Sequence, residues 1–550
     1  MNPQSDVSNS PSSEPSRSIN RSGTLDQQRL KSLAEVDNAP FSRFHVKVCC
    51  VAGVGFFTDA YDIFAISIAS TMLGYVYGNS EQLDDLQNLG VKIATPIGTL
   101  IGQLLFGWLA DVLGRKKMYG FELMIIIVGT LTQAVAGSAH AVGIIGVLVM
   151  WRFIMGIGIG GDYPLSAIIT SEFASTRTRG RLMTAVFAFQ GWGQLGASIV
   201  SLIVTAAYKS SIVNSLPFEV PIDFMWRIVI GLGCVPACIA LYFRLTIPET
   251  PRFTMDIERN IANATRDIEI MYTTNAGLYN ADERENHAVV ERIEAPRATR
   301  RDFWAHFSKW KNGKVLLGCA WSWFVLDVAF YGLNLNTSTI LQNIGFNVGG
   351  SSTAVNSNGD RIHDAQAVYN SLFSTAVGNV ILSVAGLIPG YWVSFLFIDS
   401  WGRKPIQLMG FSVLTVLFLI MGFAFDKFNG HGNDAPAAKA FVFLYCLTNF
   451  FQNFGPNTTT FIIPGEVFPT RYRSTAHGIS AASGKLGAVL AQLISFAAKN
   501  STKTVLEVYA FFMLTGIAST LLLPETRGKS LEELSNEDQE KFMHVKSHSS

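Results

Sequence analysis

Long apolar runs alternate with short polar stretches along most of this chain. Each run is long enough for a helix to cross a bilayer core about 30 Å thick, which takes roughly 20 residues. The pattern predicts twelve membrane-spanning helices, over residues 47–77, 91–113, 117–138, 141–172, 181–208, 224–247, 313–343, 366–398, 404–426, 439–468, 474–498 and 504–524. We therefore expect an all-α membrane protein.

Three polar segments lie outside this pattern: residues 1–45, 250–312 and 525–550. The first is Ser-rich and lacks the apolar core of a signal peptide, so the first span is expected to act as the insertion signal. The two tails have the composition of disordered segments. Charged residues make up 15% of the chain, against roughly 25% in a soluble domain. The net charge of +1 points to no partner, and we expect none among nucleic acids.

Basic residues gather in the short loops on one side of the predicted membrane. They are Arg115, Lys116, Lys117, Arg177, Arg179, Arg181, Arg403, Lys404, Arg471 and Arg473. The loops on the opposite side are poorer in Lys and Arg. The positive-inside rule therefore predicts that the basic loops, both tails and the central segment 250–312 are cytoplasmic.

The second half of the chain repeats landmarks of the first. "DVLGRKK" begins at Asp111 and "DSWGRKP" at Asp399; "SEFASTRTR" is matched by "GEVFPTRYR", and "PETPR" by "PETRG". These pairs occur in the same order and at equivalent places among the spans. The chain is thus predicted to hold two pseudo-symmetric six-helix halves, 46–249 and 313–524. Paired halves of this kind characterise secondary transporters, whose site lies between them near mid-membrane.

These motifs carry a family resemblance. "GWLADVLGRKK" resembles the loop signature of the major facilitator superfamily, and "PETPR" and "PETRG" resemble its sugar-porter-like branch. "GGDYPLSAIITSE" is similar to the signature of the phosphate:proton symporter family, and the likeness extends from about residue 45 to 530. It implies the major facilitator fold and proton-coupled import of inorganic phosphate by alternating access, at the plasma membrane.

The stretch "GIGIGG" from Gly156 to Gly161 matches the dinucleotide-binding pattern G-x-G-x-x-G. That pattern needs a strand before it and a helix after it, whereas this one lies inside an apolar run. Gly156 and Gly160 have instead the spacing that lets membrane helices pack closely. Packing explains the glycines and leaves Asp162, the acid that follows them, to be explained.

Few charged residues fall within the spans, and each costs several kcal/mol unless it is paired or hydrated. The clearest are Asp59, Asp62, Glu122, Arg152, Asp162, Asp327 and Lys485. Asp162 either forms a structural ion pair or exchanges protons. Arg152 is ten residues away, about 15 Å along a helix, so another partner is needed. Asp59 and Asp62 share a helix face and are the candidates for Arg152. The residues we associate with proton coupling are Asp59, Asp62, Arg152, Asp162 and Lys485.

Trp323, Asp327 and Tyr331 form one stripe on the seventh span, because they are spaced by four residues. Asp327 lies about 20 Å along the helix from Lys314 at the inner edge, near mid-membrane. A stripe that holds a carboxylate at this depth favours a binding site over packing. The resemblance implies that phosphate is bound by Tyr163, Gln190, Trp323, Asp327, Tyr331 and Asn457; Gln190 and Asn457 are equally open to a packing role.

The loop motifs also predict ion pairs that hold the inner face together. Asp111 is expected to pair with Arg115 and Asp399 with Arg403. Glu172 is expected to pair with Arg177 or Arg179. Its counterpart Glu466 is expected to pair with Arg471 or Arg473.

Other functions are less consistent with the sequence. A sugar or polyol symporter of the same branch would want several amides in the seventh and tenth spans. A nutrient receptor would want a long cytoplasmic tail, and an enzyme a nucleophile–base or metal-ligand set. We expect no catalytic residue, cofactor or metal. The expected ligands are inorganic phosphate, its analogue arsenate, and protons.

Overall fold

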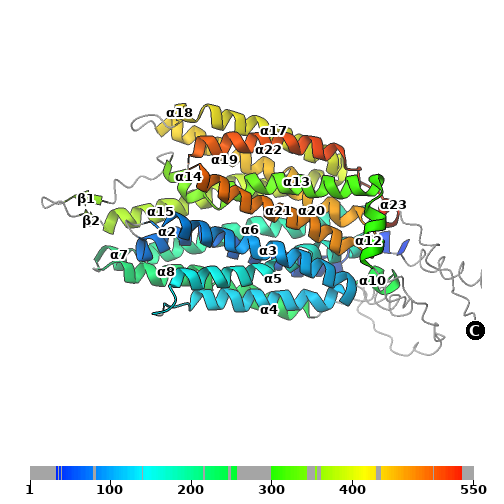
Figure 1. Cartoon of the computed structure of the whole chain (residues 1–550), viewed down its shortest axis with the longest axis horizontal. Coiled ribbons are helices and arrows are strands. Elements are labelled where there is room, and N and C mark those ends of the chain that lie inside the picture. Colours follow the sequence, from blue (N-terminus) through cyan, green and yellow to red (C-terminus); the bar gives the residue numbers. More distant parts are fainter. Residues whose placement is uncertain are drawn as a thin grey trace, which may run out of the picture.

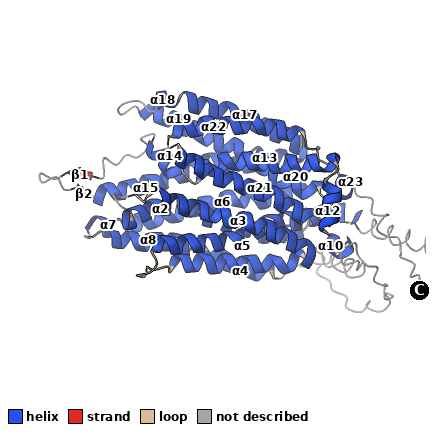
Figure 2. Cartoon of the chain, viewed as in Figure 1, coloured by secondary structure: helices blue, strands red, loops and turns tan. Residues whose placement is uncertain are grey.

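The computed structural model describes residues 33–34, 36–38, 40–78, 82–138, 140–214, 217–245, 249–256, 299–343, 353–355, 361–363, 365–428, 435–498 and 501–535. Most of the two tails and of the central segment lie outside these ranges. The described residues form a long helical bundle, with one small exception (Figure 2). The strands β1 (Thr353–Val355) and β2 (Arg361–His363) pair antiparallel at one end.

Six helical spans make up the N-terminal half. They are α2 (Arg43–Tyr77), α3 (Asp85–Leu113), α4 (Arg115–Ala134), α5 (Ile144–Phe173), α6 (Arg179–Ala207), and the nearly continuous pair α8 (Glu219–Gly231) and α9 (Cys234–Arg244). Two short helices, α7 (Lys209–Asn214) and α10 (Pro251–Asp256), lie outside the spans. Apolar segments adopt helices here because a helix satisfies its own backbone hydrogen bonds away from water.

Six more spans make up the C-terminal half. They are α13 (Trp310–Asn334), the continuous run α15 (Ala365–Leu382), η1 (Ser383–Leu387) and α16 (Ile388–Trp401), then α17 (Arg403–Phe423), the pair α19 (Ala435–Asn453) and α20 (Pro456–Val467), α21 (Arg473–Ala497) and α22 (Thr502–Leu521). Short helices accompany them: α12 (Arg300–Phe307), α14 (Thr337–Asn343), α18 (Phe425–Phe428) and α23 (Leu531–Ser535).

The structure refines two of the expected spans. The tenth, over 439–468, is broken at Gly455, and α20 restarts at Pro456, which has no N–H to give to the preceding turn. The seventh, over 313–343, is two helices, because α13 ends at Asn334 and α14 begins at Thr337. Among the described residues, ten helices are long and apolar enough to cross a membrane, and α4 and the interrupted α19–α20 complete the twelve.

Glycines let helices pack at backbone distance. A methyl group on Gly156 would collide with the carbonyl oxygen of Thr95 on α3, and one on Gly160 with that of Thr99. The expected packing role of these two glycines is therefore confirmed. A similar approach joins the halves, because a methyl group on Gly478 of α21 would collide with the carbonyl oxygen of Gln103 on α3.

The halves lie side by side, with α21 against α3 and α16 against α6 (Figure 1). One end of the bundle carries α10, α12 and α23 and the loops rich in Arg and Lys; we call it the basic-loop end. The other end carries α7, α14 and α18 and is called the opposite end.

Candidate functional site

A buried ion pair lies in the C-terminal half, where α13 meets α21, and Tyr163 of the N-terminal half faces it. Lys485 Nζ lies 2.8 Å from Asp327 Oδ2 and also donates to the Tyr331 hydroxyl at 2.9 Å. The side chains of Lys485 and Asp327 are each only 2% exposed. A charged pair this deep costs desolvation energy that a hydrophobic pair would not, so it marks a functional site more readily than a stabilising one.

Aromatic rings from both halves enclose the lysine. Lys485 Nζ lies 4.7 Å from the ring centroid of Tyr163 on α5 and 4.3 Å from that of Tyr331. A cation between such ring faces gains electrostatic stabilisation without a second carboxylate. Trp323 is buried on the same stripe, and α21 approaches it at Gly484, where a methyl group would collide with the indole. The structure thus brings the seventh-span stripe and Tyr163 together around one ammonium group.

Amides and a hydroxyl form a second buried chain beside this cluster. Asn457 Nδ2 donates to the hydroxyl of Tyr391 at 2.8 Å and to Asn453 Oδ1 at 2.6 Å. The Tyr391 hydroxyl donates to Gln190 Oε1 at 3.3 Å, which links the C-terminal half to α6. Rings connect the two groups, because Phe187 packs edge-on against both Tyr163 and Tyr391. All six residues expected to bind substrate are therefore buried in one region between the halves.

Sequence reasoning missed Tyr391 and Asn453 in this region. Tyr391 lies in the apolar run "GYWVSFLF", where the sequence does not distinguish a tyrosine that donates a hydrogen bond from one that only packs. Asn453 ends α19, in a span with three further amides, Asn449, Gln452 and Asn457. The tight amide cluster in this span was the available signal for Asn453.

A second ionic cluster lies within the N-terminal half and explains Asp162. Arg244 of α9 contacts Asp162 Oδ2 at 2.5 Å and Glu122 Oε1 at 2.7 Å, and all three side chains are fully buried. Ser166, one turn on from Asp162, donates to its other carboxylate oxygen. Arg244 was not predicted, because it sits near the end of a span and reads in sequence as an interfacial charge. Asp162 is therefore ion-paired, with a partner on another helix.

Asp59 lies beside this cluster without joining it. Both of its carboxylate oxygens are buried and have no hydrogen-bond partner in the described part of the chain. It interacts electrostatically with Asp162 and Arg244, and also with Tyr163 and Tyr331 of the Lys485 cluster. Asp59 is thus the acid that connects the two clusters through space.

The expected partner of Arg152 is corrected. Within the described ranges neither Asp59 nor Asp62 makes an ion pair with it; Arg152 Nε donates to the Val91 carbonyl at 3.0 Å. Asp62 instead accepts from the Thr130 hydroxyl at 2.7 Å and interacts with Arg152 only at longer range. The two acids share a face of α2, but that face is turned to α4 and α9 rather than to the Arg152 guanidinium.

At the basic-loop end, two of the expected ion pairs form within single loops. Arg115 lies 3.2 Å from Asp111, and Arg403 lies 2.9 Å from Asp399. Each acid also reaches across to the other half. Asp111 accepts from the backbone N–H of Thr475 at the start of α21, and Asp399 from that of Arg181 at the start of α6. Both carboxylates therefore sit at helix N-termini, where negative charge is stabilised.

The expected partners of Glu172 and Glu466 were wrong. Glu172 pairs across the halves with Arg473 at 2.9 Å and lies 3.7 Å from Arg115. Glu466 pairs within its own half, with Arg403 at 2.9 Å. Local spacing misled the prediction, because α5 ends at Phe173 and the following loop leads its arginines away from Glu172. The halves are thus joined at this end by a direct Glu172–Arg473 ion pair.

The remaining arginines of these loops have other surroundings. Arg177 is exposed, Arg471 stacks on Tyr472, and Arg179 pairs with Asp37 at 3.3 Å. Asp37 also binds Arg252, which in turn binds Glu532 at 2.9 Å. Although burial opposes it, the Arg252 guanidinium holds the pKa of Glu532 at about 2. Segments before and after both halves therefore take part in closing the basic-loop end.

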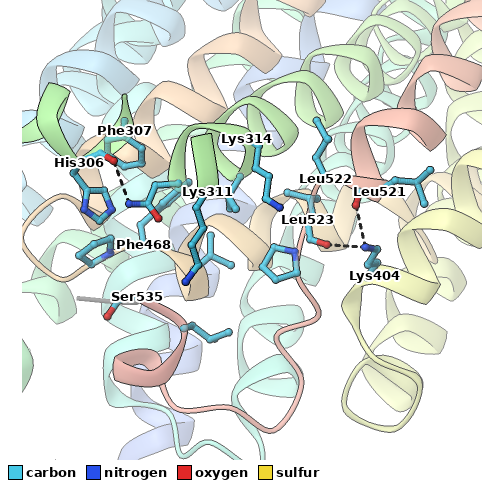
Figure 3. Close-up of a pocket in the computed structure, with 16 residues that line it drawn as sticks. His306, Phe307, Lys311, Lys314, Lys404, Phe468, Leu521, Leu522, Leu523 and Ser535 are labelled. Carbon is cyan, nitrogen blue, oxygen red and sulfur yellow. Dashed lines mark hydrogen bonds between the residues drawn. The ribbon is translucent and has the colours of Figure 1, made fainter. Parts of the chain in front are cut away.

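A pocket of about 370 Å³ opens at the basic-loop end of the C-terminal half (Figure 3). Three lysines line it, and Lys404 is already held by the carbonyl oxygens of Leu521 and Leu523. None of the expected substrate residues lies in this pocket, and no residue of the N-terminal half lines it. It is therefore separate from the site between the halves. In the described part of the chain, no group of three His, Cys, Asp or Glu residues is placed to hold a metal ion.

Known proteins match the chain over most of its length. The signature of the sugar (and other) transporter family matches residues 48–537. A repressible high-affinity phosphate permease of Neurospora crassa is 48% identical over 93% of this chain and 90% of its own length. An inorganic phosphate transporter of Saccharomyces cerevisiae is 49% identical over 93% of this chain and 87% of its own length.

A solved structure shows the same fold. It is a proton:xylose symporter of the major facilitator superfamily, superposed with a TM-score of 0.65 over 90% of this chain and 98% of that one. The two sequences are only 19% identical, so this likeness bears on architecture alone.

Proposed function

The chain belongs to the sugar (and other) transporter family, and from this premise we propose that it imports inorganic phosphate together with protons by alternating access. The observation that carries the proposal is the buried Lys485–Asp327 pair of the C-terminal half, which faces Tyr163 of the N-terminal half. The names of the two fungal relatives support phosphate as the substrate.

The groups around this pair suit dihydrogen phosphate. Lys485 and the Asn457 amide donate hydrogen bonds in this region, and the Tyr391 hydroxyl donates to Gln190. The Tyr331 hydroxyl, which accepts from Lys485, also has a proton to donate, so the region offers the donors that an oxyanion requires. A carboxylate in an anion site is otherwise unfavourable because the two negative charges repel. Dihydrogen phosphate keeps two protons, however, and can donate a hydrogen bond to Asp327. Arsenate has similar protonation and is a further expected substrate. Sulfate near neutral pH has no proton to donate.

Charge balance couples the proton to the anion. Asp327 and Lys485 neutralise each other when both are ionised. An arriving monoanion adds one negative charge, which costs several kcal/mol in a desolvated site. A proton on Asp327 restores neutrality and frees the Lys485 ammonium to bind phosphate. Anion and proton therefore favour each other's binding at this pair, which is the thermodynamic requirement of a symporter.

Asp59 and Asp162 supply a route for the proton. Three acids, Asp59, Asp162 and Glu122, surround the single charge of Arg244, so they cannot all be ionised at low cost. Among the described residues, Asp59 has no hydrogen-bond partner to stabilise its charged form, and it interacts electrostatically with Tyr331. We assign Asp59 as the acid that exchanges protons. The charges of Asp162 and Arg244 set the electrostatic potential at its carboxylate.

The two ends of the bundle then act in turn. The basic-loop end is closed by the Glu172–Arg473 ion pair and by the hydrogen bonds that Asp111 and Asp399 accept from the other half. These contacts must break for phosphate to be released at this end. By the positive-inside rule, the basic loops support a cytoplasmic position for this end and for both termini. We assign the importer to the plasma membrane.

Uptake by purified protein in proteoliposomes tests the substrate. Four amides lie in the α19–α20 span, a feature that a sugar symporter would share, so labelled xylose belongs beside labelled phosphate in the assay. We expect saturable phosphate uptake that arsenate inhibits and xylose does not. Xylose uptake without phosphate uptake would reverse the assignment.

A further inference from the structure

Lys92 is a buried cation that has no counter-ion among the described residues. It lies on α3 near the opposite end, and its side chain is 6% exposed. Its ammonium donates to Asn336 Oδ1 at 2.9 Å. Within the described ranges no carboxylate lies within ion-pairing distance of it. The acids at the start of its helix, the N-cap Asp84 and Asp85, are about two turns away, about 10 Å along the axis. A buried ammonium held by one neutral amide is unusual, because its desolvation is uncompensated.

The partner of Lys92 belongs to the other half. Asn336 follows α13, so the bond joins the halves at the opposite end. Two similar contacts lie beside it: Gln194 Nε2 donates to Asn334 Oδ1 at 2.9 Å, and the Ser338 hydroxyl donates to the Ser67 carbonyl at 2.8 Å. We call these three contacts the amide latch. Apart from the Lys92 ammonium, every group in the latch is neutral.

The two ends are therefore closed by different chemistry. At the basic-loop end, Glu172 and Arg473 neutralise each other across the halves. At the opposite end the only charge in the latch is the positive charge of Lys92, and no carboxylate in the part of the chain that the structure describes pairs with it. An anion that reaches this end gains more from Lys92 than the Asn336 amide does, because a hydrogen bond between two charged groups is the stronger one.

The latch is also connected to the site. Asn336 Nδ2 donates to Gln492 Oε1 at 3.1 Å, and Gln492 Nε2 donates to the Tyr331 carbonyl at 3.3 Å. Asn336 is nine residues beyond Asp327, about 13 Å further along the helix direction. Lys92 thus lies about two to three turns from the Lys485–Asp327 pair, on the side of the opposite end.

We infer that Lys92 is the admission site for the substrate anion. Phosphate binds the ammonium in place of the Asn336 amide, which loosens the amide latch as the anion enters. The inference rests on the proposed function and on entry from the opposite end. It assigns Lys92 a role in capture that is separate from the recognition at Asp327.

Two variants in the proteoliposome uptake assay test this. Lys92→Gln removes the charge but keeps a polar group, and Asn336→Asp keeps the lysine and gives it a permanent carboxylate that competes with phosphate. We expect each to raise the KM for phosphate by at least about tenfold, the loss expected for one hydrogen bond to a charged group, and to change kcat much less. If Lys92 had only a structural role, the Asn336→Asp variant would be as stable as wild type or more stable, and its KM for phosphate would be that of wild type.

Lys503→Gln is the matched control. Lys503 is an exposed lysine at the same end, paired with Asp426 at 2.6 Å, and its loss should leave KM unchanged. A KM within about twofold of wild type in either test variant contradicts the inference. If the Lys92→Gln variant does not insert into the membrane, the KM of the Asn336→Asp variant tests the inference by itself. Absence of phosphate uptake by the wild type would instead overturn the proposed function, and this inference with it.

Discussion

Lys485 of α21 lies 2.8 Å from Asp327 of α13, and both are buried in the C-terminal half where it faces Tyr163 of the N-terminal half. Because the two charges cancel, the net charge of the site depends on whether Asp327 carries a proton. The pairing also makes each residue costly to lose alone, because the partner is left as an unpaired buried charge.

Replacing Asp327 tests this relationship. Asp327→Asn should reduce phosphate uptake to background and destabilise the protein by about 3–5 kcal/mol, because Lys485 loses its counter-ion. The double variant Asp327→Asn with Lys485→Met should recover most of that stability and none of the transport. Thermal unfolding in detergent and uptake in proteoliposomes measure the two effects. Near-normal uptake by Asp327→Asn would remove this acid from the mechanism.

Removing the buried acids of the N-terminal half should separate proton coupling from phosphate binding. Asp59→Asn, Asp62→Asn and Asp162→Asn should each weaken proton-driven accumulation. Asp59→Asn should do so with the smallest loss of stability, since the Asp59 carboxylate accepts no hydrogen bond from any described residue. Exchange of internal for external phosphate, which needs no net proton movement, should survive in Asp59→Asn. If all three variants accumulate phosphate as steeply as wild type, the proton follows another route.

Breaking the ion pair between the halves should shift the conformational equilibrium. Glu172→Gln removes the cross-half contact with Arg473, whereas Glu466→Gln removes a contact within one half. We expect Glu172→Gln alone to lengthen the distance between spin labels at exposed Arg177 and Arg527, on opposite halves of the basic-loop end. Equal distances in both variants would show that the Glu172 pair does not hold this end closed.

Anion selectivity should follow from proton sharing at Asp327. Sulfate loses a hydrogen bond to a charged group, worth about 1.5–3 kcal/mol, and adds repulsion in a desolvated site. It should therefore compete with phosphate at least roughly a hundredfold less well than arsenate, since about 1.4 kcal/mol is tenfold. Inhibition of labelled-phosphate uptake at pH 6 gives the comparison. Equal inhibition by sulfate and arsenate would exclude proton sharing as the basis of selectivity.

The stability of the basic-loop end should depend on pH through His306. Burial, and then the charges of Arg471 and Lys309, lower the pKa of this imidazole to about 4 from 6.5. The unfolded chain therefore binds a proton that the folded chain does not, and stability should fall as pH drops from about 6.5 towards 4. His306→Gln should remove this component from the pH dependence of thermal unfolding. An unchanged pH profile would show that His306 is not the responsible group.

The sequence was sufficient for features that depend on spacing within one helix. Trp323, Asp327 and Tyr331 share a stripe because they are spaced by four residues, and Gly156 and Gly160 pack against α3 for the same geometric reason. The paired loop motifs were sufficient to predict two six-helix halves, since the same motifs recur in the same order in both halves of the sequence.

Contacts between distant helices were not predictable in the same way. Arg244 binds Asp162 across 82 residues, and Glu172 binds Arg473 across 301, so neither spacing indicates the pair. Nearby arginines in the same loops gave a plausible but wrong partner for Glu172. Tyr391 was hidden because a tyrosine in an aromatic run has the same pattern whether it packs or donates a hydrogen bond.

Proton coupling at the Lys485–Asp327 pair is tested most directly by phosphate accumulation in proteoliposomes under an imposed pH gradient. With the acidic side at the entry face, we expect wild-type protein to concentrate labelled phosphate above the external level, and a protonophore to abolish this. Asp327→Asn should not accumulate phosphate under either condition. Accumulation that is the same with and without the gradient would contradict coupled transport.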